Sequence, residues 1–359
     1  MLYHLLYPLR DSIGAFNVFR YLTFRSMLAF VICLVLVLWL QPIFIRWFQA
    51  KRLGQPIRDD GPESHQVKQG TPTMGGVVLV LAIILSTLLL ADLNNLYVWV
   101  VVVLTALYGL LGFVDDFKKV RKKNTKGVRA KTKLVWQILI ATVAVLTLVL
   151  YGNNFSTTLF IPFFKNISFD LGYWFIPFAV LVIVGSSNAV NLTDGLDGLV
   201  IGPTMTVAFA YGVFAYVAGN TQIASYLQIE YIPGCGDLAI FAAAVIAGGL
   251  GFLWFNAFPA SVFMGDVGSL ALGGALGILA IITKQELVLL IAGGVFVVEA
   301  LSVIAQVTSF KLTGKRVLLM APIHHHFELK GLDEPKIIVR CWIVSIVLAL
   351  IAIATLKLR

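Results

Sequence analysis

The sequence predicts an all-α integral membrane protein with about ten transmembrane helices, and three observations favour this fold class. The chain of 359 residues is 59% hydrophobic and only 13% charged, whereas soluble domains carry about 25% charged residues. Many of its apolar runs reach the roughly 20 residues that a spanning helix needs. The alternating polarity of a membrane barrel is absent, so helices must satisfy the backbone hydrogen bonds in lipid. No repeat or low-complexity linker divides the chain, and residues 1–359 are expected to form a single domain.

The expected helices follow the apolar runs in order. Residues 1–16 precede them and lack the basic segment and the small-residue cleavage site of a signal peptide, so they are expected to remain as an interfacial segment. The three cysteines are scattered and provide neither a disulfide framework nor zinc-ligand spacing. The predicted spans are 26–48, 75–91, 97–114, 134–151, 173–187, 199–218, 239–256, 268–283, 286–309 and 337–356.

The basic residues predict how these helices are oriented. Twenty of the 27 Lys and Arg residues fall in the loops after the first, third and ninth spans. Because cytoplasmic loops are enriched in Lys and Arg, these loops are expected to be cytoplasmic and both termini periplasmic. Arg10, Arg20 and Arg25 are a weaker signal for the opposite orientation. Such loops near anionic headgroups explain the net charge of +9, so no nucleic-acid partner is expected.

Four polar segments interrupt the apolar runs, and the predicted topology places all four on the cytoplasmic face. The most polar is Asn188–Gly198 (NAVNLTDGLDG), with two Asn and two Asp residues. An ionised carboxylate inside the bilayer costs about 2.5–3.5 kcal/mol on insertion scales, so a surface loop facing water or a cation is expected. The other three are Thr71–Gly76 (TPTMGG), Phe113–Lys119 (FVDDFKK) and Phe263–Ser269 (FMGDVGS). Their convergence on one face predicts a shared site with a cytoplasmic active face.

The acidic residues in these segments have both functional and structural interpretations. Asp115 and Asp116 suit Mg²⁺ together with phosphate oxygens, or they form a solvated helix end paired with nearby lysines. Asp266 lies among small residues that let a backbone approach a phosphate, or it caps the next helix. Asp197 suits a ligand-binding loop, or it caps the helix that follows.

Two familiar loop motifs are excluded by spacing. Counting from Asn191, the twelfth position of an EF-hand, which requires Glu, is Gly202. Thr71–Gly76 offers Gly and hydroxyl groups at a helix start, which suits an anion, but no Gly-Lys-Ser/Thr follows as in a P-loop. A helix start led by Pro72 is the structural alternative.

A histidine run and one mid-span acid complete the candidate residues. His324, His325 and His326 follow Pro322. Consecutive side chains point in different directions, which disfavours three ligands to one zinc ion, whereas contact with phosphate or sugar fits a basic loop. Glu299 lies within the ninth span, and an intramembrane acid is expected to face the bundle interior.

Together, these segments resemble the phospho-N-acetylmuramoyl-pentapeptide-transferase family, a branch of the polyprenyl-phosphate N-acetylhexosamine-1-phosphate transferases. The family's aspartate pair is matched by Asp115 and Asp116, its Asn-rich loop by NAVNLTDGLDG, and its FMGD element by Phe263–Asp266. TPTMGG and APIHHHFE, from Ala321 to Glu328, resemble the muramyl branch in particular. The resemblance extends from the N-terminal segment to the last span.

The resemblance implies a multi-pass enzyme of the bacterial inner membrane that acts in peptidoglycan synthesis. It would move phospho-N-acetylmuramoyl-pentapeptide from its uridine diphosphate carrier to undecaprenyl phosphate, giving lipid I and uridine monophosphate. No ATP is required, because one pyrophosphate bond is broken and another is formed. The resemblance also implies that Asp266 binds Mg²⁺ with Asn191 as a further ligand, and that Asp115 acts on the lipid phosphate with help from Asp116.

The remaining implied site residues contact nucleotide, sugar or phosphate, with Phe263 stacking on uracil. These substrate-binding candidates are Lys68, Thr71, Asn188, Asn191, Leu192, Asp194, Gly195, Asp197, Phe263, His324, His325 and His326. Whether the lipid phosphate attacks directly or a covalent aspartyl intermediate forms first is left open, as is a homodimer.

Two other functions remain as alternatives. A transferase of N-acetylglucosamine-1-phosphate shares the superfamily and the reaction type. An ion-coupled transporter belongs to another class and would need ionisable residues at mid-membrane together with broken helices. Only Glu299 is clearly mid-span in this sequence, which favours the transferase.

Overall fold

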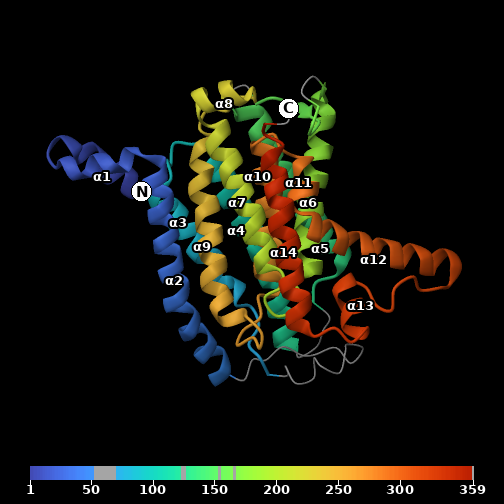
Figure 1. Cartoon of the computed structure of the whole chain (residues 1–359). Coiled ribbons are helices and arrows are strands. Elements are labelled where there is room, and N and C mark those ends of the chain that lie inside the picture. The colour runs from blue at the N-terminus through green and yellow to red at the C-terminus, as the bar shows by residue number, and fades with distance from the viewer. Residues whose placement is uncertain (52–69, 123–126, 153–154, 165–166, 358–359) are drawn as a thin grey trace.

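The computed structural model describes residues 1–51, 70–122, 127–152, 155–164 and 167–357, which fold into a helical bundle (Figure 1). Nine helices in these ranges are long and apolar enough to cross a membrane, and α3 (Gly76–Leu90) is a shorter apolar helix. The nine are α2 (Leu22–Ala50), α4 (Leu96–Lys122), α5 (Ala130–Tyr151), α6 (Phe175–Thr193), α7 (Ile201–Ala218), α9 (Leu238–Asn256), α10 (Gly265–Ile282), α12 (Gly294–Thr313) and α14 (Glu334–Ala354). The predicted all-α polytopic fold is confirmed.

The remaining elements are short. An antiparallel hairpin pairs Leu159 with Phe169, and it lies at the end of the bundle that also carries α8 and the C-terminus (Figure 1). The short helices are α1 (Leu2–Leu6), α8 (Thr221–Leu227), α11 (Val288–Ala292) and α13 (Ile323–Leu329), and the strands are β1 (Thr158–Phe160) and β2 (Ser168–Asp170).

Helix α10 is the centre of the bundle. All of its residues from Val267 to Ile282 are buried, and it packs against α3, α4, α6 and α7. Glycines recur along α10 and let its neighbours approach closely: a Cβ at Gly273 would lie 2.7 Å from Ser187 Cα, and one at Gly277 would lie 2.7 Å from Ile183 Cα. Asp266 lies in the first turn of α10, so this packing fixes its position.

The predicted span 286–309 is wrong in one respect, because the structure breaks it into α11 and α12. Helix α11 ends at Ala292 and α12 begins at Gly294. Two consecutive glycines have low helix propensity and offer no side chains to stabilise a continuous helix at this point. Helix α12 leaves the bundle sideways (Figure 1).

The third predicted span, 97–114, is longer in the structure. Helix α4 continues to Lys122, so Asp115 and Asp116 lie within the helix rather than at its end. Both are buried, with 3% and 4% of their surface exposed. The interpretation of this pair as a solvated helix end is therefore wrong.

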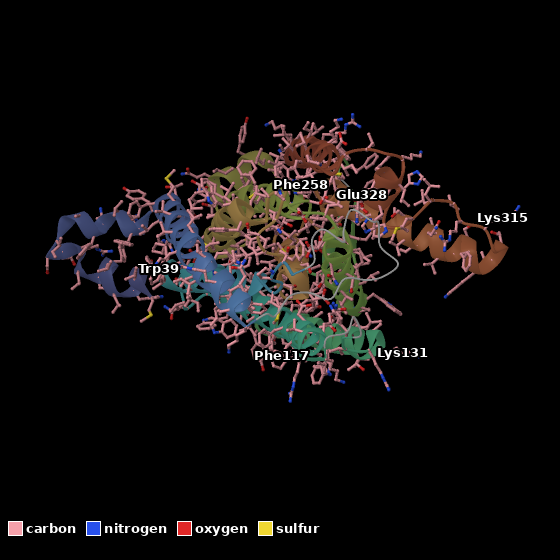
Figure 2. All side chains as sticks on the ribbon, turned by 90° about the horizontal axis from the view of Figure 1, so that it is seen from below. Trp39, Phe117, Lys131, Phe258, Lys315 and Glu328 are labelled. Atoms are coloured by element: carbon pink, nitrogen blue, oxygen red, sulfur yellow. The ribbon has the colours of Figure 1, made fainter. Side chains whose placement is uncertain are left out.

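The predicted convergence of the polar segments on one end of the bundle is confirmed. Figure 2 views the bundle from this end, with Phe117 on α4, Phe258 after α9 and Glu328 on α13 labelled. Lys315 lies at the far tip of α12, beyond the bundle (Figure 2). Which side of a membrane this end faces stays a prediction.

Candidate active site

Two glycines let α4 and α10 approach so closely that the carboxylates of the two helices lie side by side. A Cβ at Gly112 would lie only 2.2 Å from the carbonyl oxygen of Asp266, which no side chain tolerates. Gly265, at the start of α10, has a φ of +73°, a backbone conformation that glycine adopts without a steric penalty. Asp115 and Asp116 follow Gly112 by one helical turn, so the same approach places them beside the first turn of α10.

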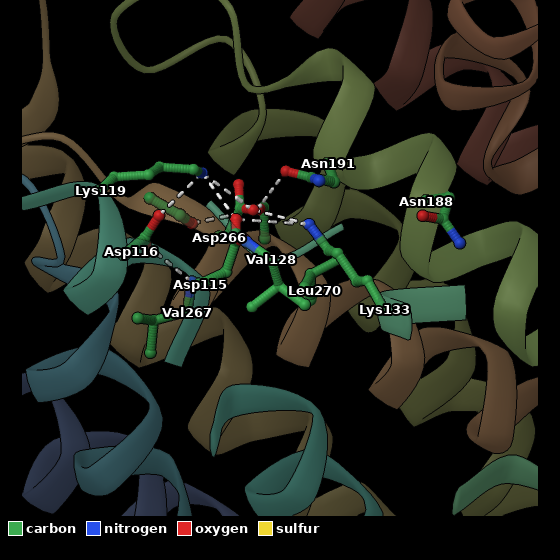
Figure 3. Close-up of polar contacts among 12 residues, drawn as sticks. Asp115, Asp116, Lys119, Val128, Lys133, Asn188, Asn191, Asp266, Val267 and Leu270 are labelled. Carbon is green, nitrogen blue, oxygen red and sulfur yellow. Dashed lines mark hydrogen bonds and ion pairs between the residues drawn. The ribbon is translucent and has the colours of Figure 1, made fainter. Parts of the chain in front are cut away.

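The three carboxylates form a compact cluster. Asp115, Asp116 and Asp266 each contribute an oxygen, and these oxygens lie within 4.8 Å of one another (Figure 3). The backbone amide of Val128 donates to Asp115 Oδ1, and the amide of Val267 donates to Asp116 Oδ2 at 3.3 Å. Like charges at this separation are unfavourable unless a cation lies between them or one carboxyl group is protonated. An oxygen-only set of carboxylates is the type that hard divalent cations such as Mg²⁺ prefer, so these residues fit such an ion.

Two lysines supply positive charge to the cluster. Lys119 Nζ lies 2.7 Å from Asp115 Oδ2, 3.2 Å from Asp116 Oδ1 and 3.2 Å from Asp266 Oδ2. Lys133 Nζ, from α5, lies 2.6 Å from Asp266 Oδ2 and 3.9 Å from Asp115 Oδ2. Two ammonium groups leave one charge uncompensated when all three carboxylates are ionised. In that ionisation state the cluster attracts a further cation.

The Thr71–Gly76 segment holds the loop that leads into α10. The amide of Phe263 donates to the carbonyl of Pro72 at 2.8 Å, and the amide of Gly76 donates to the carbonyl of Met264 at 3.0 Å. Two stretches that are distant in sequence thus pair along their backbones at the functional end. Thr71 and Phe263 are both partly exposed there.

The Asn188–Gly198 segment contributes residues to the cluster and residues that face elsewhere. Asn191 Oδ1 accepts from Ser269 Oγ of α10 at 3.0 Å, which places Asn191 beside the carboxylates in Figure 3. Asn188 is turned away from them (Figure 3) and donates to Gln137 Oε1 at 3.0 Å. The structure therefore brings Asn191, but not Asn188, together with Asp266.

Asp194 lies just beyond the end of α6, within the electrostatic field of the cluster. Burial raises the pKa of its carboxyl group to about 8, and the negative charges of Asp266, Asp116 and Asp197 add to that rise. A carboxyl group with a pKa near neutrality can carry a proton, and therefore donate a hydrogen bond, at the pH of the cell.

Asp197 has a different environment from Asp194. Its Oδ2 accepts from the amide of Ala260 at 3.0 Å, and its own amide donates to Glu334 Oε1 at 3.0 Å. It is only 4% exposed. Asp197 thus ties the segment to the loop after α9 and to the start of α14, while Leu192 is 37% exposed on the surface of the same segment.

His324 approaches the same segment from α13. Its Nδ1 lies 3.0 Å from Glu299 Oε2 of α12, and the two side chains are 1% and 2% exposed. The buried Glu299 thus faces protein, as predicted for an intramembrane acid. The opposite edge of the imidazole meets Gly195, where a Cβ would lie 2.2 Å from Nε2.

The other two histidines have separate partners. His325 Nδ1 lies 2.6 Å from Glu328 Oε2, one turn along α13. His326 Nδ1 accepts from the amide of Leu319 at 3.1 Å, which orders the chain between α12 and α13. The run therefore presents three rings in three different surroundings.

Comparisons with known proteins assign the chain to a family. Residues 98–284 match the family described as Glycosyl transferase family 4, and residues 68–80 match phospho-N-acetylmuramoyl-pentapeptide-transferase signature 1. The phospho-N-acetylmuramoyl-pentapeptide-transferase of Citrifermentans bemidjiense is 59% identical over 359 residues, which cover 100% of both chains. The chain belongs to this family. The enzymes of the same name from Pelobacter propionicus and Oleidesulfovibrio alaskensis are 58% and 54% identical, again over 100% of each chain.

The family signature begins at Lys68, a predicted phosphate contact that lies outside the described residues. Two site residues were missing from the predicted site: Lys119 was considered only as an ion-pair partner of the aspartates, and Lys133 only as a basic loop residue. Lys119 follows the aspartate pair by three and four positions, and this helical spacing was a usable signal. Lys133 reaches the cluster from a different helix, and nothing local in the sequence indicates that contact.

Proposed function

We propose that this protein transfers phospho-N-acetylmuramoyl-pentapeptide from uridine diphosphate-N-acetylmuramoyl-pentapeptide to undecaprenyl phosphate, which gives lipid I and uridine monophosphate. The meeting of three carboxylates with two lysines at one end of a membrane bundle carries this proposal. A site at that position can receive both a water-soluble diphosphate donor and a lipid phosphate. Relatives that share the full length of the chain and carry the transferase name support it.

The carboxylate cluster supports a division of roles. Asp266 and Asn191 are proposed to hold Mg²⁺, and when bound the ion neutralises charge on the donor diphosphate. Asp115 and Asp116 are proposed to orient the lipid phosphate or take its proton. Lys119 and Lys133 lie where their ammonium groups can contact phosphate oxygens, so positioning and charge neutralisation are expected to supply most of the catalysis.

The nucleotide is proposed to bind along the Asn188–Gly198 segment, with Phe263 stacking on uracil. Asn191, Asp194 and the exposed Leu192 are proposed to contact it directly. Asn188 and Asp197 are proposed to shape the segment through the partners described above. Lys68, Thr71, Gly195 and the three histidines remain proposed contacts for phosphate, sugar or nucleotide.

The proposed setting is the bacterial inner membrane, with residues 1–359 acting as one domain and the site on the cytoplasmic side. The clustered basic residues support this orientation through the positive-inside bias. The donor is made of charged groups that do not cross a bilayer unaided, so a cytoplasmic site is the side on which a nucleotide-linked precursor is available.

The test is release of uridine monophosphate by the purified protein in detergent, given both substrates and Mg²⁺. Release that depends on both substrates without any membrane gradient would support a transferase, whereas no release would contradict the proposal and leave the transporter standing. The same assay with uridine diphosphate-N-acetylglucosamine tests the donor. Equal turnover of the two donors would overturn the muramyl assignment and leave the reaction type intact.

A further inference from the structure

Glu299 and His324 form a buried carboxylate–imidazole pair outside the carboxylate cluster. The pair joins α12, which leaves the bundle, to α13 at the functional end (Figure 1). Glu299 Oε2 and His324 Nδ1 are 3.0 Å apart, and both side chains are almost fully buried. An ionisable residue in such a position is unfavourable unless a partner compensates for its lost hydration.

This contact determines which ring nitrogen of His324 carries the hydrogen. A carboxylate only accepts hydrogen bonds, so Nδ1–H is the donor to Glu299. In the neutral ring, Nε2 is then a lone-pair acceptor. Nε2 is buried, and within the described ranges no donor reaches it. A buried acceptor without a donor is uncommon in folded proteins, and a bound water, an ion or a ligand can each account for one.

The direction of Nε2 identifies where that molecule would lie. The atom faces Gly195, so closely that a Cβ there would be 2.2 Å away. Gly195 follows Asp194 directly, within the segment whose Asn191 contacts α10 beside the carboxylates. The buried, unpaired acceptor therefore faces the segment proposed to bind the nucleotide.

We propose that Glu299 is a positioning residue for the donor nucleotide and acts through His324. Glu299 holds the imidazole so that Nε2 accepts a hydrogen bond from a hydroxyl or N–H group of the nucleotide. This inference rests on the proposed function, because it assigns a specificity role to a residue behind the proposed nucleotide site. The competing interpretation is that the pair only fastens α13 to α12.

Two substitutions separate these interpretations by different chemistry. In Glu299→Gln the amide can donate to Nδ1, which favours the tautomer with hydrogen on Nε2 and removes the acceptor. In His324→Asn the side-chain amide can still donate to Glu299, but the Nε2 atom is absent. Both variants keep a buried hydrogen bond between α12 and α13, so a purely fastening role predicts little effect from either one.

The measurements are the KM for the uridine diphosphate donor, the KM for undecaprenyl phosphate and inhibition by uridine monophosphate. Each variant is expected to raise the donor KM and the inhibition constant about tenfold, which corresponds to one lost hydrogen bond. The KM for the lipid is expected to stay within about twofold. The double variant is expected to resemble either single variant rather than their product, because both act through one contact.

Ser302→Ala is the matched control. Ser302 lies on α12 one turn after Glu299, is also buried, and its hydroxyl donates to the carbonyl of Glu299 within the same helix. The effect belongs to the Glu299–His324 pair if this control keeps the wild-type KM values and inhibition constant. Every variant must also elute from a size-exclusion column as the wild type does. If Glu299→Gln does not fold, His324→Asn decides alone.

Unchanged inhibition by uridine monophosphate in a folded His324→Asn protein would overturn the inference. A raised lipid KM with a normal donor KM would also overturn it. Both outcomes presuppose a wild-type protein that releases uridine monophosphate from the muramoyl donor. Failure of the wild type to do so would instead refute the proposed function, so the two ideas fail in different experiments.

Discussion

Replacing Gly112 by Ala should separate the two halves of the carboxylate cluster without altering any carboxylate. The added Cβ would lie 2.2 Å from the Asp266 carbonyl oxygen, whereas ordinary contacts begin at 3.4 Å. The obstructing atoms are backbone, and no side chain can rotate away. Helices α4 and α10 must therefore move apart by roughly 1 Å, which carries Asp115 and Asp116 away from Asp266.

The expected effect is large on catalysis and moderate on stability. A displacement of about 1 Å in a catalytic group can lower the rate about 100-fold. Overpacking of a well-packed contact costs about 1–3 kcal/mol in the free energy of unfolding. Gly112→Ala should therefore fold in detergent with a lower unfolding temperature and lose about 100-fold in turnover.

Gly109→Ala is the matched control on the same helix. Its Cβ would have its nearest neighbours at 3.4 Å from Val80 and 3.6 Å from Ala271, both side-chain atoms at ordinary contact distance. The assay is release of uridine monophosphate at saturating substrates, with thermal unfolding measured in parallel. Turnover of Gly112→Ala within twofold of wild type, or an equal loss in Gly109→Ala, would refute the close-approach argument.

Four further predictions concern charge and topology. Asp266→Asn should lower turnover by orders of magnitude in a folded protein, and normal turnover across a Mg²⁺ titration would remove Asp266 from the metal site. Lys133→Met removes an ammonium that competes with the ion 2.6 Å from Asp266, so the Mg²⁺ concentration for half-maximal activity should fall; an increase would contradict this. Burial raises the Asp194 pKa to about 8, above its unfolded value near 4. The free energy of unfolding should therefore fall as pH rises between these values, because only the unfolded state loses this proton. Asp194→Asn has no such proton, so its stability relative to wild type should increase between pH 5 and pH 8. In intact cells, an impermeant thiol reagent should label a cysteine at Gln222 but not one at Lys131; the reverse would invert the orientation.

The sequence predicts the spans well because hydrophobic length is a local property. Eight of the ten expected helices appear as single helices of spanning length, and α3 matches the short run after Thr71–Gly76. The break before α12 escaped prediction because the apolar run continues through Gly293 without a polar signal. Apolar composition indicates that a segment is buried in lipid or protein, but it does not indicate whether the segment forms one straight helix or a broken one.

Contacts between helices are the part of the site that local pattern does not reveal. The burial of Asp115 depends on the α4–α10 approach at Gly112, and the position of Lys133 depends on α5. Likewise, Asn188 looks like a ligand residue in sequence, yet it bonds to Gln137. A polar side chain near a membrane needs a hydrogen-bonding partner, which can be either protein or substrate. The composition of a segment therefore indicates where the site lies, but it does not distinguish a ligand-binding residue from a structural one.

The type of partner distinguishes these roles once the structure is known. Asp197 is held by the backbone amide of Ala260, a donor fixed by the fold and unable to leave. Asp266 Oδ2 is contacted by the ammonium groups of Lys119 and Lys133, which sit on long side chains that can rotate aside. A divalent cation or a phosphate can therefore take over the contacts of Asp266 with little rearrangement, whereas replacing the contact of Asp197 would require the chain itself to move. On this basis Asp266 is the exchangeable carboxylate and Asp197 the structural one, although both lie between closely spaced glycines in the sequence.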